Sequence, residues 1–532
     1  MKNLNFIGLI LIIVAFNVNC NSKKRYNKTI SSEHTVKELR KDIDFTFREI
    51  EKLHPKLYWY ITKENLDFKI DSVKKSITQP MTSKEFYFVL FPLVSEIRQA
   101  HNHIEFPRNA LSKKDRLKYT YSNSCFDSLQ LETINNKVFV TNSVLKDSTI
   151  LHSQVLQIGE FSTDELIKKH NAIYNSDGYN TTFINRRSGM YFKKYYGYEN
   201  QLLDTVAITL KKNDSVFIQT YYRNFEKIPS RKERKKIVKT KKKESKNTAH
   251  SEFINLKVLK SDTTISYLKI LSFSTKNYEK IYKNVFKKID AAKSQTLIID
   301  LRNNLGGTAA EAQELLKHLY SSEISANTFM ESKLRFPLTN LIIRSGGNIS
   351  PKSLTLPFYL IYEIITSKKS NNVTKSRKFL NNLSTDSYNS YSGKLFLLVN
   401  GTTFSASCDI AASLHGSKRA TIVGEETGGA YNGTVAGDFK KLQLPNSKLI
   451  VSFGLLFTRT QYLQTPDGYG VIPDVQIEPT IADRKNGIDT ELNYIIEKVK
   501  ADRLEKALQE VENEEKESEV EKELEESPDE KK

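Results

Sequence analysis

The chain has 532 residues, of which 39% are hydrophobic, so it can bury a sizeable core and two or three domains are expected. Its net charge is +19, and the local charge is most extreme in two stretches. Residues 231–246 include ten basic and two acidic residues, whereas 502–532 include fourteen acidic and six basic residues. Such runs are typical of solvated loops and tails, and no nucleic-acid motif accompanies them, which argues against a nucleic-acid partner.

The first residues have the features of an export signal. Lys2 gives a positive start, and 6–16 is an unbroken apolar run that is too short to span a bilayer, which takes about 20 residues. Cys20 follows where a lipoprotein signal places its acylated cysteine, and the alternative is an ordinary signal, cleaved or uncleaved, in which Cys20 has no role. We therefore expect a signal peptide over 1–20, and a protein on the periplasmic side of a bacterial cell envelope with a lipid on Cys20.

A helical domain is predicted over 21–110. Apolar residues between Val36 and Ile50 recur at spacings of three and four, which indicates one face of a helix. His54-Pro55 ends that helix, and Thr82 can cap a second one.

The pattern changes to strands over 111–226. Short runs rich in β-branched residues lie at 138–140, 155–158 and 206–210, and Thr163 opens a short helix after Gly159. This order resembles a PDZ-like peptide-binding module, and a generic β-rich domain is the alternative. The basic stretch that follows, 227–252, is predicted to be a linker or surface loop.

Strands and helices then alternate over 253–491, which predicts an α/β layered domain. Strands are expected at 265–270 and 296–300, and helices at 278–292 and 309–320. Residues 321–393 form an insertion that the pattern does not assign, and 492–532 is expected to be a charged tail, a frayed helix or disordered. Cys125 and Cys408 are interpreted as two buried thiols rather than a disulfide.

Three segments of the α/β domain carry the chemistry. A buried strand from Thr296 runs through Asp300-Leu-Arg302-Asn-Asn-Leu to the paired glycines Gly306 and Gly307, which let the backbone approach a ligand closely. A second strand, 394–399, leads to Phe404-Ser405-Ala406-Ser-Cys and a helix, whose amino end favours a developing negative charge. The third segment is a strand that begins at 420 and leads to a Gly-Glu-Glu-Thr-Gly-Gly turn at 424–429. By itself, Ser405 is more often a helix cap than a nucleophile.

Together and in this order, the three segments closely resemble the tail-specific, or C-terminal-processing, serine peptidase family. The resemblance covers about 266–477. It implies a crotonase-like (ClpP-like) ββα spiral core, Ser405 as the nucleophile, and an oxyanion hole formed by Gly306 or Gly307 with the Ala406 amide.

The family divides according to its general base. The lysine that one branch carries after the Gly-rich turn is replaced here by Ala430. The tricorn-like branch uses a histidine, and 97–104 resembles its motif with His101 at the catalytic place. Asp467, in Pro-Asp-Gly-Tyr-Gly-Val-Ile-Pro-Asp, would then replace the acid that orients the histidine, or simply form a turn.

A metal site is the alternative for His101 and His103, which share a face if they lie on a strand. Further ligands at suitable spacing are lacking, so neither a metal nor a cofactor is predicted. The predicted activity is endopeptidase cleavage of peptides or unfolded protein tails in the envelope. A catalytically inactive protein that binds peptides or apolar ligands on the same scaffold is the alternative, and a membrane-surface scaffold is a third hypothesis. The oligomeric state does not follow from the sequence.

Overall fold

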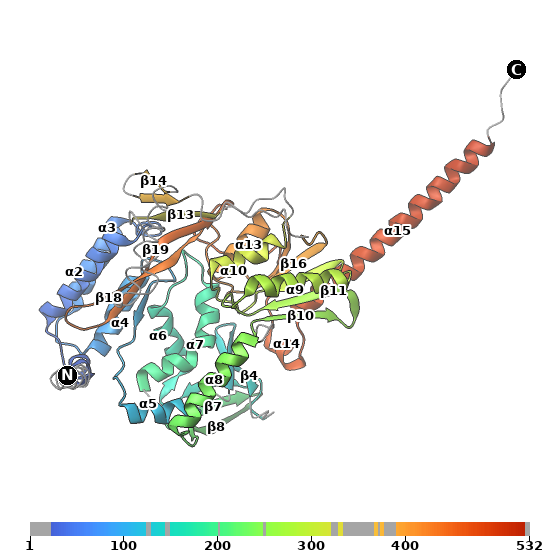
Figure 1. Cartoon of the computed structure of the whole chain (residues 1–532). Helices are drawn as coiled ribbons and strands as arrows, with labels where there is room; N and C mark the ends of the chain where they lie inside the picture. The colour runs from blue at the N-terminus through green and yellow to red at the C-terminus, as the bar shows by residue number, and fades with distance from the viewer. Residues whose placement is uncertain are drawn as a thin grey trace, which may run out of the picture.

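The computed structural model describes residues 23–123, 129–143, 149–200, 203–247, 252–320, 328–333, 367–370, 373–376 and 390–526. It is a mixed α/β protein with three parts: an amino-terminal group of helices, a small antiparallel sheet and a larger α/β core (Figure 1). Cys20, Cys125 and most of the 321–393 insertion lie outside the described residues.

The amino-terminal helices form because their ends are capped and their apolar faces are continuous. Thr35 and Glu38 make a capping box at the start of the first long helix, and Thr82 and Glu85 make another. The buried apolar face packs against Phe453 and its neighbours on strand β19 (Ile450–Thr460). The helices are α2 (Val36–Leu53), α3 (Lys63–Ser76), α4 (Ser83–Ser95) and α5 (Lys113–Thr120). The predicted helices in the amino-terminal region are thus present.

The β-rich part is an antiparallel sheet in the order β3-β4-β5-β7-β8, with β6 paired to β5. Its strands are β3 (Leu129–Ile134), β4 (Lys137–Ser143), β5 (Gln154–Ile158), β6 (Phe161–Ser162), β7 (Thr205–Lys212) and β8 (Ser215–Tyr222). Two helices accompany it, α6 (Thr163–Ile173) and α7 (Thr182–Asn200). A small ribbon of β2 (Ser122–Asn123) and β9 (Asn224–Phe225) flanks it. The expected strands and the short helix at Thr163 are confirmed.

The basic stretch differs from the prediction, because α8 (Arg231–Asn247) makes it a helix rather than a loop. Ser230 and Glu233 bond each other's backbone amides at its start, and no glycine or proline interrupts the lysines and arginines that follow. Straight-chain basic residues favour helix once the end is capped.

The core sheet has the order β10-β11-β12-β16-β17-β20, parallel from β11 onward. Its strands are β10 (Ile254–Leu259), β11 (Asp262–Ile270), β12 (Thr296–Asp300), β16 (Lys394–Val399), β17 (Thr421–Gly424) and β20 (Val475–Gln476). The helices are α9 (Tyr278–Ala291), α10 (Ala309–Lys317), α13 (Ala406–Gly416) and α14 (Ile481–Asn486). Because β12 and β16 are parallel neighbours, the Gly-Gly segment and the Ser405 segment leave the same edge of the sheet.

A second sheet joins distant segments beside that edge. It contains β1 (His103–Glu105), β13 (Thr328–Ser332), β14 (Ser367–Ser370), β15 (Val373–Ser376), β18 (Thr434–Gln443) and β19 (Ile450–Thr460). β1 pairs with β19, with His103 opposite Ser452, so the segment after α4 is drawn toward the core.

The charged tail is largely one helix, α15 (Thr490–Glu526), whose far end projects from the body (Figure 1). Ile495 and Val499 near its start are buried against the core sheet, whereas Leu504, Leu508 and Val511 are exposed. Within the described residues, the structure contains no helix with the length and apolar character needed to span a membrane.

Candidate active site

Ser405 lies in a tight turn between β16 and α13, with φ 55° and ψ −127°. A positive φ at a non-glycine residue is strained, and such strain is concentrated at functional sites. The serine does not cap the helix, since its side chain makes no capping hydrogen bond there. Its Oγ instead lies 3.2 Å from His101 Nε2. The turn therefore points the hydroxyl at the imidazole, as a nucleophile and its base require.

His101 lies in the loop between α4 and β1, and its ring packs between two phenylalanines. It stacks on Phe404 at 4.6 Å between ring centroids, and Phe439 lies 5.9 Å away. Burial, followed by the positive charge of Arg187, lowers the pKa of His101 to about 4. The imidazole is therefore neutral at pH 7 and can accept a proton.

The second nitrogen of the imidazole meets a hydroxyl rather than a carboxylate. His101 Nδ1 lies 3.1 Å from Oγ1 of Thr434, the first residue of β18. Thr434 also lowers the pKa of Asp177, whose Oδ2 is buried without a hydrogen-bond partner among the described residues. Neither Thr434 nor Asp177 belongs to the sequence motifs from which the site was predicted.

Asp177 lies in the connection between α6 and α7 and is fully buried. Its Oδ1 accepts a hydrogen bond of 2.8 Å from the amide of Ala100, the residue before His101. Burial raises its pKa to about 6, although the Ala100 and Ala430 amides and Thr434 act in the opposite direction.

Asp467 is not brought to His101, contrary to the expectation. Its carboxylate accepts hydrogen bonds from Trp59 Nε1 at 2.7 Å and Asn432 Nδ2 at 3.0 Å. It also accepts one from the Gly468 amide, which is the turn chemistry of a Pro-Asp-Gly segment. Asp467 therefore stabilises its own loop, because the Pro-Asp-Gly turn and these side-chain donors use both carboxylate oxygens.

The paired glycines lie against the serine. A β-carbon on Gly306, whose φ is 98°, would fall 2.9 Å from Ser405 Cβ and 3.0 Å from the Ala406 nitrogen. One on Gly307 would fall 2.1 Å from the Phe273 carbonyl oxygen. Only glycine fits at either place. The Gly306 amide donates to Asn304 Oδ1 at 2.9 Å, which leaves it committed within the turn.

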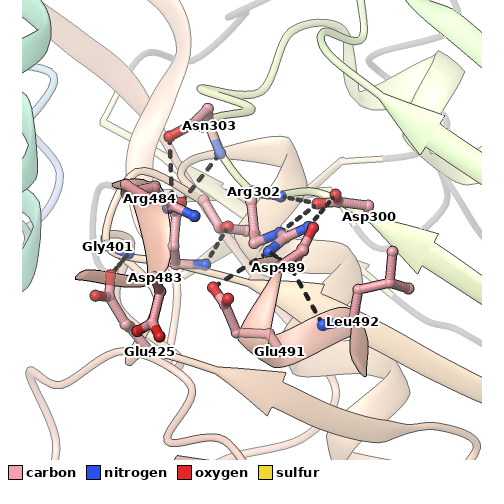
Figure 2. A network of polar contacts seen from close by, with 12 residues as sticks. Asp300, Arg302, Asn303, Gly401, Glu425, Asp483, Arg484, Asp489, Glu491 and Leu492 are labelled. Atoms are coloured by element: carbon pink, nitrogen blue, oxygen red, sulfur yellow. Dashed lines mark hydrogen bonds and ion pairs between the residues drawn. The ribbon is translucent and has the colours of Figure 1, made fainter. Parts of the chain in front are cut away.

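The polar residues before the glycines form a structural network, shown in Figure 2. Arg302 contacts Asp300 at 2.8 Å, Asp489 at 2.7 Å and Glu491 at 3.2 Å, which ties the start of α15 to the end of β12. Asn303 donates its amide to Asn400 Oδ1, so the two segments that leave the sheet are joined. Asp300 and Arg302 thus hold the loop in place and do not face the serine.

Neither a lysine base nor a metal arrangement is found near Ser405 in the described ranges. Ala430, which follows the Gly-rich turn where one branch of the tail-specific peptidases carries lysine, is buried. His103 packs on Phe91 and Tyr174, at centroid distances of 5.7 and 6.4 Å. No group of three or more His, Cys, Asp or Glu side chains among the described residues is placed to hold a metal ion. Cys408 is a buried free thiol.

Comparisons with known proteins found one matching family model and solved structures that are similar in fold. Residues 264–482 match the model of peptidase family S41. The structure of mature CPAF complexed with lactacystin is similar in fold, with 13% identity and a TM-score of 0.55 over 86% of this chain and 97% of that chain. A second structure of mature CPAF has 12% identity and a TM-score of 0.53 over 86% and 96%. The curated proteins gave no match.

Proposed function

We propose that this chain, whose residues 264–482 match the model of peptidase family S41, is a serine-type peptidase with Ser405 as its nucleophile and His101 as its general base. The single observation that supports this most is the 3.2 Å contact between Ser405 Oγ and His101 Nε2. The substrates that we propose are peptides or unfolded protein tails in the cell envelope.

The reaction follows from these two side chains. His101 Nε2 takes the hydroxyl proton as Ser405 Oγ attacks the scissile carbonyl carbon, and the imidazolium then gives that proton to the departing amine. The acyl-enzyme ester is next hydrolysed by water, which His101 deprotonates. Because burial lowers the pKa of His101 to about 4, the imidazole is unprotonated at pH 7 and its Nε2 lone pair is available to the serine proton.

The oxyanion hole that we propose is formed by the amides of Gly307 and Ala406. Ala406 is the first residue of α13, so its amide faces outward with the helix dipole behind it. Gly306 is less suited as a donor, since its amide already bonds Asn304, but its lack of a side chain leaves room beside Ser405. Two convergent amides at a helix start stabilise developing negative charge.

Cleavage of unfolded casein and of a mixed peptide library tests this proposal. We expect Ser405→Ala and His101→Ala each to lower kcat/KM by about 10³-fold or more. Ser76→Ala, at an exposed serine, and His415→Ala, at a histidine in the last turn of α13, are matched controls that should retain activity. Full activity in either site variant would refute the assignment, and no turnover by folded wild type would favour a binding protein.

We further infer that the core is a crotonase-like spiral and that the β-rich sheet is a PDZ-like module that holds substrate chains. β8 ends that sheet, and Val216, Ile218 and Tyr222 on it are exposed, which suits the addition of a peptide strand. Ile218→Glu should raise KM for unfolded substrates while leaving kcat unchanged. Ile488→Glu, at another exposed isoleucine, is the control, and equal effects of both would contradict the inference.

For location, we propose a lipid anchor on Cys20 at the cell envelope, supported by the apolar run at 6–16 before it. One saturated acyl chain binds membranes only marginally, so a stable anchor requires more than one chain. Cys20→Ser should abolish incorporation of labelled palmitate and release the protein from membranes, whereas Cys125→Ser should do neither. Unchanged labelling in Cys20→Ser would exclude this site.

A further inference from the structure

We propose that Asp177, acting through the Thr434 hydroxyl, is the positioning acid that orients His101 in place of Asp467. The inference rests on the proposed function, because it concerns how the base is held. It assigns a role to two residues that lie far from each other and from His101 in the sequence.

The backbone around His101 is held by the segment that carries Asp177. Asp177 Oδ1 accepts from the Ala100 amide at 2.8 Å, and the Gly178 amide donates to the Arg98 carbonyl at 2.9 Å. Arg98 itself has a positive φ of 54°, so its loop adopts a shape that needs such support. The acid therefore fixes the main chain on the amino side of the imidazole.

The side-chain contacts fix the direction of the protons. An ionised Asp177 can only accept, and its Oδ2 is buried without a hydrogen-bond partner in the described part of the chain, so we infer that the Thr434 hydroxyl turns its hydrogen toward this oxygen and uses a lone pair toward His101. His101 Nδ1, 3.1 Å from that oxygen, must then carry the hydrogen. This leaves the lone pair on Nε2, which is the nitrogen that faces Ser405 Oγ. The same chain stabilises the imidazolium formed during attack.

Other titratable groups lie near Asp177. Among the described residues, however, no cation contributes to the shift of its pKa. The groups whose pKa it raises are Tyr60, Cys408 and Asp409. Asp409, one turn after Ser405 in α13, has its pKa raised to about 7 by burial and then by Asp177. Because nothing of opposite charge offsets burial, Asp177 can become protonated in mildly acidic solution, when it no longer acts as a pure acceptor.

Asp467 provides an internal comparison on the same side of the molecule. Both are aspartates, but Asp467 bonds Trp59 and Asn432, whereas Asp177 bonds the loop of His101. The two carboxylates are thus distinguishable by isosteric replacement with asparagine in the full-length protein.

The test is steady-state cleavage by Asp177→Asn and Asp467→Asn across pH. We expect Asp177→Asn to lower kcat by about 10²- to 10⁴-fold with KM little changed, and Asp467→Asn to stay within about 10-fold of wild type. The acid limb of wild-type kcat/KM should lie near pH 6 and move to lower pH in Asp177→Asn. Normal kcat in Asp177→Asn, or a larger loss in Asp467→Asn, would overturn the proposal.

Thr434 keeps the proposal testable if Asp177→Asn does not fold. Thr434→Val removes the hydroxyl at equal size and should lower kcat strongly, while Thr434→Ser should restore it; equal activity of these two variants would refute the relay. Failure of the proposed function is a different result, because activity would then survive Ser405→Ala or be absent from wild type. Failure of this inference leaves activity that depends on Ser405 and His101 but not on Asp177.

Discussion

Two buried aspartates, Asp300 at the end of β12 and Asp177 between α6 and α7, have opposite surroundings. Asp300 lies beside Arg302 and Lys269, and these cations outweigh burial and hold its pKa at about 2. Asp177 has hydrogen-bond donors instead, and burial raises its pKa to about 6. The first arrangement secures the structure at every physiological pH, whereas the second keeps a carboxylate close to its titration point. Perturbation of the second kind is typical of a functional site.

The largest loss of stability is expected when the ion pair between Asp300 and Arg302 is removed. Arg302→Met leaves Asp300 and Glu491 buried without their partner, so the free energy of unfolding should fall by about 3–5 kcal/mol. Urea unfolding followed by circular dichroism measures it. Lys63→Met, which removes an exposed ion pair with Asp67, is the control and should leave the midpoint nearly unchanged. Equal losses in both would contradict the structural role of Arg302.

Gly306 lies in the loop that begins at Arg302, and it packs against Ser405. This loop therefore joins the ion-pair network to the proposed active site. In Gly306→Ala the new methyl meets the Phe404 carbonyl oxygen at 2.7 Å on a backbone with φ 98°, so we expect about 1–3 kcal/mol of lost stability and a kcat about 10²-fold lower. Gly437→Ala also has a positive φ but meets only a leucine side chain at 3.2 Å. If the two variants lose kcat equally, close packing at Ser405 is not the cause.

The smallest effect is a gain of stability on the Asp177 side. A carboxyl whose folded pKa is raised contributes stability below its unfolded pKa and loses it as pH rises through about 6. Asp177→Asn should therefore raise the free energy of unfolding by about 1–2 kcal/mol at pH 7, although it lowers activity. Asp300, whose folded pKa is depressed, behaves oppositely, and its contribution is lost as pH falls from about 4 to 2. Urea unfolding at pH 4 and pH 7 measures both, and a less stable Asp177→Asn at pH 7 would contradict this account.

The sequence predicted those parts of the site that lie in continuous segments. Gly306, Gly307, Ser405 and Ala406 each follow a strand of the core, and parallel pairing of β12 and β16 brings their segments together. His101 came from a short motif, and the structure brings it to Ser405. In these cases local pattern and resemblance led to segments that the structure brings together.

Asp177 and Thr434 were missed because their relation to His101 is made only by tertiary packing. Asp177 lies between two helices in an Asp-Gly turn, a common surface pattern, and burial gave no signal in the sequence. The resemblance directed attention to Asp467, whose partner Trp59 is also distant in sequence. The helix α8 was missed for a different reason, since charge runs were interpreted as loops although lysine and arginine favour helix.

The most direct test of the central claim is mass spectrometry after reaction with diisopropyl fluorophosphate, which modifies activated serines. We predict one stoichiometric adduct on the peptide that contains Ser405, none in Ser405→Ala, and labelling at least about 10²-fold slower in His101→Ala. An adduct on another residue, or labelling of Ser405 at an unchanged rate without His101, would contradict the Ser405–His101 mechanism.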